Sequence, residues 1–130
     1  MTNLNFVSIP SMEAFTKDLT GEYKVSDVLG TAMCKLHTAF PKDAWLSPSI
    51  QNYAILNYFS ADDAVHAVNY KWWRDACRLQ VSRCDQLFVI MFNDWNASVG
   101  VVDEIEIARS LNILVRYWDP YTNSEQLDVI

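Results

Sequence analysis

Glu104 is the residue whose type and position point most directly to chemistry. It stands four residues after Gly100 in a segment whose apolar residues recur at helical spacing, so the two share one helix face near its N-terminus. The helix dipole favours a carboxylate there, and a glycine lets a ligand approach the backbone closely. A carboxylate so placed can attack an anomeric carbon, as in retaining glycosidases. The alternative is an exposed glutamate that only complements the dipole.

Three further polar residues are candidates for the same site. Ser98 is either an N-cap or, with the amides after it, part of a nest for a phosphate-sized anion. Asp94 follows an apolar run and is a candidate general acid, an acceptor for a ribose hydroxyl, or only a turn residue. Asp75 stands in a helical segment beside two tryptophans, where solvation at the surface is the simpler interpretation. These residues favour a nucleotide-sized pocket.

The residue types that bind metals form no pattern. His37 and His66 lie in helical segments with no metal-type partner nearby, and the three cysteines, Cys34, Cys77 and Cys84, lack metal-ligand spacing. An odd number of cysteines, without a signal peptide, favours reduced thiols in a cytoplasmic protein. We therefore expect neither a metal nor a cofactor.

Around these residues the sequence predicts alternating strands and helices. Apolar runs predict strands at 4–9, 44–46, 87–92 and 113–118, and helical patterns cover 26–40, with Ser26 as its cap, 62–83 and 100–111. Residues 12–21 and 50–60 show no clear period. The order predicts an α/β protein, a three-layer flavodoxin- or Rossmann-like sandwich with a largely parallel sheet of four or five strands and helices on both faces. Binding loops then lie at the carboxyl ends of the strands, where Asp94, Ser98, Gly100 and Glu104 stand.

Length and charge limit the classes of function. A chain of 130 residues forms one domain, 1–130, with a single core. The net charge of -6 and the lack of a basic stripe argue against a nucleic-acid polymer as partner. No apolar run is long enough to span a bilayer, so no membrane association is expected.

The order of motifs resembles the nucleoside 2-deoxyribosyltransferase superfamily, most closely its small bacterial and phage members of unassigned function. Their pattern runs C-D, an apolar strand, then W-x-x-S-x-G-x-x-x-E-x-x-x-A, which this chain matches from Cys84 to Ala108. Three further matches extend the resemblance along most of the chain. They are the first strand with its proline loop (Phe6 to Pro10), a strand ending in Ser-Pro (Trp45 to Pro48), and a tryptophan-bearing helix leading into Cys-Asp (Trp73 to Asp85).

The resemblance implies a function and a set of site residues. Glu104 would be the nucleophile that forms a glycosyl-enzyme intermediate, and Ser98 with the amides near Gly100 would bind the 5′ side of the sugar. The transferases tend to have aspartate where Ser98 stands, whereas the monophosphate hydrolases have serine, so the resemblance favours an N-glycosidase acting on a nucleoside or its 5′-monophosphate. Further substrate contacts are expected from the matched segments: Ser8, Pro10, Ser47 and Trp95.

The resemblance also implies a homodimer or larger homo-oligomer, because relatives complete their sites with residues of a neighbouring subunit. The aromatic segment 117–121 is a candidate for that interface, or equally for the core. One departure affects the activity: the family often has an aspartate, offered as the general acid, where this chain has Cys77. Asp75 or Asp94 would have to replace it. Otherwise the protein would be a catalytically inactive module that senses or sequesters a nucleotide.

Overall fold

The computed structural model describes residues 2–10, 24–48 and 70–129. The described elements are, in chain order, β1 (Leu4–Ser8), α2 (Lys24–Ala39), β2 (Ala44–Leu46), α5 (Tyr70–Ser82), β3 (Gln86–Ile90), the 3-10 turn η1 (Trp95–Ala97), α6 (Val99–Ser110), β4 (Leu114–Asp119) and β5 (Ser124–Gln126). One sheet runs in the order β2-β1-β3-β4-β5. Its first four strands are parallel, and β5 is antiparallel to β4. The predicted α/β class and largely parallel sheet are confirmed.

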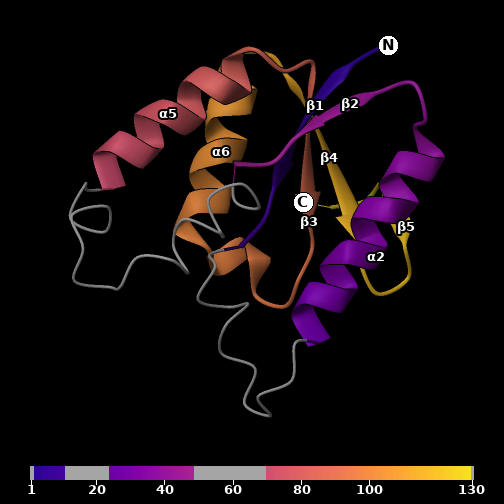
Figure 1. Cartoon of the computed structure of the whole chain (residues 1–130). Helices are drawn as coiled ribbons and strands as arrows, with labels where there is room; N and C mark the ends of the chain where they lie inside the picture. Colours follow the sequence, from indigo (N-terminus) through magenta and orange to yellow (C-terminus); the bar gives the residue numbers. More distant parts are fainter. Residues whose placement is uncertain (1, 11–23, 49–69, 130) are drawn as a thin grey trace.

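Helices cover both faces of the sheet, which makes the three layers (Figure 1). Side chains alternate along each strand, so neighbouring residues enter opposite cores. Phe6 and Leu87 pack with α5 and α6, whereas Val7 and Phe88 pack with α2. Trp118 is buried in the core against α2, and Tyr117 is buried in the core against α6. These two residues of the aromatic segment 117–121 therefore serve as core.

The strand order identifies the point at which proteins of this topology generally bind ligands. β1 lies between β2 and β3, so the chain leaves β1 toward one neighbour and later returns on the other side. In this flavodoxin-like order, ligands bind outside the carboxyl ends of the strands at the point where the order reverses. That point lies between the ends of β1 and β3, where Ser8 pairs with Val89.

At the opposite end of the strands, hydrogen bonds from the Cys84-Asp85 motif join the amino ends of β1 and β3. The Leu4 amide donates to the Asp85 carboxylate at 2.7 Å, and the Asp85 amide donates to the Leu4 carbonyl at 2.7 Å. The Cys84 thiol donates to the Gln80 carbonyl at 3.3 Å, and burial raises the pKa of this thiol to about 11. The motif therefore sets the register of β1 and β3 at their amino ends, away from the candidate site.

Some predicted boundaries were wrong or lie outside the described residues. Ser26 lies within α2, which begins at Lys24, so it does not cap that helix. The helix expected at 100–111 ends at Ser110, and Leu111 is its C-cap with 44% of its surface exposed. Strand β5 was not expected, since its sequence Ser-Glu-Gln has no apolar alternation. The segments 12–21 and 50–60, and the first part of the helix expected at 62–83, lie outside the described residues.

Within those described ranges, no helix has the length and apolar composition that crossing a bilayer requires.

Candidate functional site

The N-terminus of α6 is capped as predicted. Ser98 has extended backbone angles, and its hydroxyl accepts a hydrogen bond from the Val101 amide at 3.5 Å. A side chain added at Gly100 would meet no described atom within 4 Å. The first turn of the helix therefore presents backbone to open space, which is the geometry an anion needs to approach helix-terminal amides.

Glu104 is buried, with 8% of its surface exposed, so the alternative of an exposed first-turn glutamate is wrong. The reason is its position on α6. It lies three residues after buried Val101 and four before buried Ala108, on the side of the helix that faces the sheet. A carboxyl group is thereby held inside the molecule one turn from the helix N-terminus.

Ser8 meets this carboxyl from the sheet. It is fully buried at the end of β1, and the strand alternation places it on the same face as Phe6, toward α6. Its hydroxyl lies close enough to Glu104 to lower the pKa of that carboxyl. The two groups nevertheless form no hydrogen bond of proper geometry, and both Ser8 Oγ and Glu104 Oε2 lack a partner among the described residues. Buried polar atoms usually have hydrogen-bond partners, so these two oxygens are candidates for contact with a bound molecule.

The surroundings of Glu104 favour the neutral form of its carboxyl group. Burial raises the pKa of Glu104 to about 8, and the negative charge of Asp103 adds to the rise, against the effect of Ser8. Asp103 itself lies 3.9 Å from the Arg74 guanidinium. With a pKa of about 8, the Glu104 carboxyl is mostly protonated at pH 7.

Cys77, where the resemblance expects an aspartate, lies within electrostatic reach of Glu104. Burial, and secondly the charge of Glu104, raise the pKa of this thiol to about 12. Helix α5 thus brings residue 77 to the site, but as a thiol that keeps its proton. Asp75, on the same helix, is exposed, in line with the surface interpretation.

Asp94 and Trp95 lie in the segment that connects β3 to α6. Asp94 is exposed and left-handed, with φ 61°, and its carbonyl accepts from the Ala97 amide at 3.0 Å. Its carboxylate does not cap the following 3-10 turn, so the local geometry fits the turn interpretation and leaves the side chain available. Trp95 is half-buried, and its ring centroid lies 5.5 Å from that of Tyr117.

The ends of β1 and β2 supply the remaining candidates. Pro10 is buried just after β1. Ser47 follows β2, is 8% exposed, and its hydroxyl has no partner among the described residues. Ser8, Ser47 and Glu104 are thus three buried polar residues with unpartnered oxygens that follow, or lie close to, the carboxyl ends of strands. Such groups bind ordered water or a ligand.

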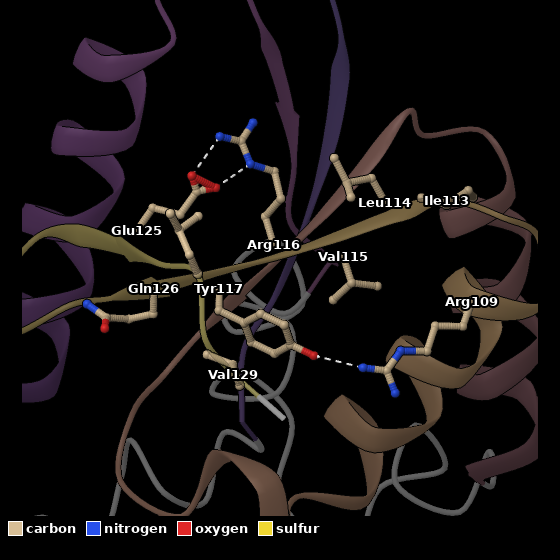
Figure 2. Close-up of a pocket in the computed structure, with 10 residues that line it drawn as sticks. Arg109, Ile113, Leu114, Val115, Arg116, Tyr117, Glu125, Gln126 and Val129 are labelled. Atoms are coloured by element: carbon tan, nitrogen blue, oxygen red, sulfur yellow. Dashed lines mark hydrogen bonds and ion pairs between the residues drawn. The ribbon is translucent and has the colours of Figure 1, made fainter.

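A separate hollow of about 660 Å³ lies along β4 and β5. Figure 2 shows two pairs of polar side chains in it that interact with each other, Arg116 with Glu125 and Arg109 with Tyr117. Arg116 donates to both oxygens of the Glu125 carboxylate, at 2.5 and 2.8 Å, and Arg109 donates to the Tyr117 hydroxyl at 3.2 Å. None of the candidate residues lines this hollow, so it is not the site that the sequence motifs indicate.

Metal-type residues remain dispersed in the part of the chain that the structure describes, where no group of three could hold an ion. His37 Nδ1 lies 2.7 Å from the Met33 carbonyl, and its ring contacts Trp45. All three cysteines are free thiols. His66 lies outside the described residues.

Comparisons with protein-family models, curated proteins and solved structures return no match. The site is therefore defined by its own geometry. The sequence analysis did not identify one contributor, Asp103, whose negative charge helps to raise the pKa of Glu104. The sequence did contain a signal for this effect. Asp103 directly precedes Glu104, so its charge is close to that carboxyl wherever the helix places the two side chains.

Proposed function

We propose that the protein cleaves the N-glycosidic bond of a nucleoside or nucleoside 5′-monophosphate, as a hydrolase or a transferase, with Glu104 as nucleophile. One observation carries the proposal. The Glu104 carboxyl is buried and has an oxygen without a hydrogen-bond partner among the described residues, and it lies one turn inside a capped helix beside the end of β1, at the point where the strand order reverses. Buried carboxyl groups with raised pKa values gather at active sites.

The reaction follows in two steps. In the first, the Glu104 carboxylate forms a bond to C1′ while the bond from C1′ to the base nitrogen breaks, and its electron pair leaves with the base. The base takes up a proton. In the second, water attacks C1′, gives up a proton, and restores the carboxylate. The balance is nucleotide plus water to free base plus sugar phosphate, and a second base in place of water makes the reaction a transfer.

The helix N-terminus suits the 5′ end of the substrate. The Ser98 hydroxyl can donate its proton to a phosphate oxygen while it still accepts from the Val101 amide. The open first turn at Gly100 leaves helix-terminal amides available to the same anion. This arrangement binds a single phosphate without the basic surface that a polymer would need.

Two demands on protons follow from the electrostatics. Glu104 must lose its proton before it attacks, and a positive charge developing at C1′ favours that loss. The leaving base must gain one. We assign this role to Asp94, because it stands exposed on the loop between β3 and α6. The Cys77 thiol, whose pKa is about 12, holds its proton too tightly to be an efficient acid at neutral pH.

A second candidate is a nucleotide-binding module without catalysis. It is favoured by the presence of Cys77, near Glu104, at the position where the resemblance expects an aspartate as the general acid. Such a module would bind a nucleotide through Ser98 and the amides near Gly100 and release no base.

The test is chromatographic detection of free base from a panel of nucleosides and nucleoside 5′-monophosphates. The wild type is compared with Glu104→Gln and with Glu106→Gln, which alters an exposed carboxylate on the same helix. We expect release by the wild type and Glu106→Gln, and none by Glu104→Gln. Release by all three would exclude Glu104 as nucleophile. No release by any, with a monophosphate still raising the Tm, would establish the binding module.

A further inference from the structure

The positions of the Ser8 hydroxyl and the Glu104 carboxyl indicate which sugar the proposed substrate contains. Ser8 is fully buried and Glu104 nearly so, and each has an oxygen without a hydrogen-bond partner among the described residues. They come from different elements, the end of β1 and the second turn of α6, yet the Ser8 hydroxyl acts on the Glu104 carboxyl. A single small group can therefore contact both.

The chemistry of the two oxygens defines that group. Glu104 must be ionised to attack C1′ in the proposed reaction, and its carboxylate oxygen then accepts a hydrogen bond, whereas a serine hydroxyl can donate one. A ligand hydroxyl can form a hydrogen bond with each of them, since it donates to Oε2 of Glu104 and accepts from Oγ of Ser8. An anion is disfavoured there by the Glu104 and Asp103 carboxylates, and an ammonium group cannot accept from Ser8.

The position of this hydroxyl on the substrate follows from the proposed reaction. When one oxygen of a carboxylate attacks C1′, its other oxygen faces the substituent on the neighbouring carbon, C2′. In retaining glycosidases, hydrogen bonds to the 2-hydroxyl strengthen in the transition state. A 2′-deoxy sugar has only hydrogen at that carbon and leaves both protein oxygens without a partner.

We propose that Ser8, together with Oε2 of Glu104, recognises the 2′-hydroxyl of a ribose, so that the site selects ribonucleotides over 2′-deoxyribonucleotides. This inference rests on the proposed function for the placement of C1′. Ser8 acts as a specificity residue that contacts the sugar and takes no part in bond breaking. Sites built to hydrogen-bond a substrate hydroxyl reject the analogue without it far more strongly than apolar pockets reject an added methylene.

The experiment measures kcat/KM for base release from matched pairs of ribonucleoside and 2′-deoxyribonucleoside 5′-monophosphates. The wild type is compared with Ser8→Ala and with the control Ser110→Ala, which removes an exposed hydroxyl at the far end of α6. We expect the wild type and the control to prefer the ribonucleotide at least about tenfold. Ser8→Ala should lower kcat/KM for the ribonucleotide about tenfold and leave the deoxy substrate nearly unchanged.

Each other outcome is decisive. Equal rates, or a preference for the deoxy substrate in the wild type, would overturn the inference while leaving the proposed function intact. An equal loss on both substrates in Ser8→Ala would show a structural role only. The wild-type ratio alone decides the matter if Ser8→Ala fails to fold.

If no nucleotide releases base, the proposed function fails, and the sugar preference is measured by binding instead. The probes are ribose 5-phosphate and 2-deoxyribose 5-phosphate, followed by the shift in Tm of the wild type and Ser8→Ala. Tighter binding of ribose 5-phosphate that is lost in Ser8→Ala would support the role of Ser8. Equal binding of the two sugars, or binding of neither, would overturn it.

Discussion

The buried carboxyl of Glu104 makes the stability of the protein depend on pH in a direction that can be predicted. We expect Glu104→Gln to become more stable than the wild type as the pH rises. Glutamine has nearly the size of a protonated glutamate and is neutral in both the folded and the unfolded chain. The substitution therefore removes the titration at residue 104 with little change in packing.

The sign follows from the pKa in each state. It is 4.5 in the unfolded chain and about 8 in the folded protein, so between these values the folded state holds a proton that the unfolded state releases. The free energy of unfolding then falls as the pH rises, by about 1.4 kcal/mol per pH unit. Across the whole interval this amounts to about 5 kcal/mol, a large part of the about 5–15 kcal/mol that holds a typical domain folded.

The assay is urea denaturation followed by circular dichroism from pH 5 to pH 9. The difference in free energy of unfolding between Glu104→Gln and the wild type should grow by about 4 kcal/mol from pH 5 to pH 8, then level off. Glu106→Gln, which changes an exposed carboxylate, should show no such growth. A difference that stays constant within about 0.5 kcal/mol over this range, the usual size of a surface effect, would mean that Glu104 is ionised in the folded protein and would refute the reasoning.

Three further predictions test the site and its support. For a substrate whose leaving group needs no proton, such as a 4-nitrophenyl riboside 5′-phosphate, kcat/KM should rise with pH up to about 8 and then reach a plateau, because only the carboxylate form of Glu104 attacks and the general acid takes no part; a rate that does not rise over this range would exclude Glu104 as the nucleophile. Ser98→Ala should cost about 1 kcal/mol in urea denaturation through loss of the cap. It should also weaken binding of a monophosphate more than that of its nucleoside, and equal weakening would place the phosphate elsewhere. Arg116→Ala should cost about 1–3 kcal/mol, since it leaves the Glu125 carboxylate without its hydrogen bonds; a cost below about 0.5 kcal/mol would show that water replaces the guanidinium at that surface.

The sequence predicted those features that depend on local periodicity. The parallel sheet and the capped helix α6 follow from apolar runs and from Ser98, whose capping role needs only the residues next to it. Strand β5 could not be predicted in this way. Its three residues pair with β4 after a turn in which Asn123 is left-handed, with φ 52°, and neither apolar alternation nor a glycine marks that turn.

The candidate site was predictable in its location but not in its electrostatics. The order of strands places Ser8 and Glu104 at one edge of the sheet, and sequence spacing alone can indicate that. Whether Glu104 points outward or inward depends on how α6 is rotated against the sheet. That rotation is set by the packing of Val101, Ile105 and Ala108 together, so burial of the carboxyl is a tertiary property.

A comparison of Arg116, on strand β4, with Glu104, on helix α6, shows why Glu104 is better explained by function than by folding. Arg116 has 23% of its side chain exposed. Its guanidinium forms an ion pair with Glu125, donates a hydrogen bond to Gln86 at 2.9 Å, and lies over the faces of two phenylalanine rings. Glu104 is more deeply buried and has no countercharge among the described residues that lowers its pKa; only the Ser8 hydroxyl does so. A glutamine or leucine at position 104 would serve the fold better, since an unpartnered buried carboxyl destabilises it above the carboxyl's normal pKa. Proteins break such local rules mainly where a ligand completes the arrangement. The burial of Glu104 beside the end of β1, without a countercharge among the described residues, therefore supports the proposal that a ligand binds there.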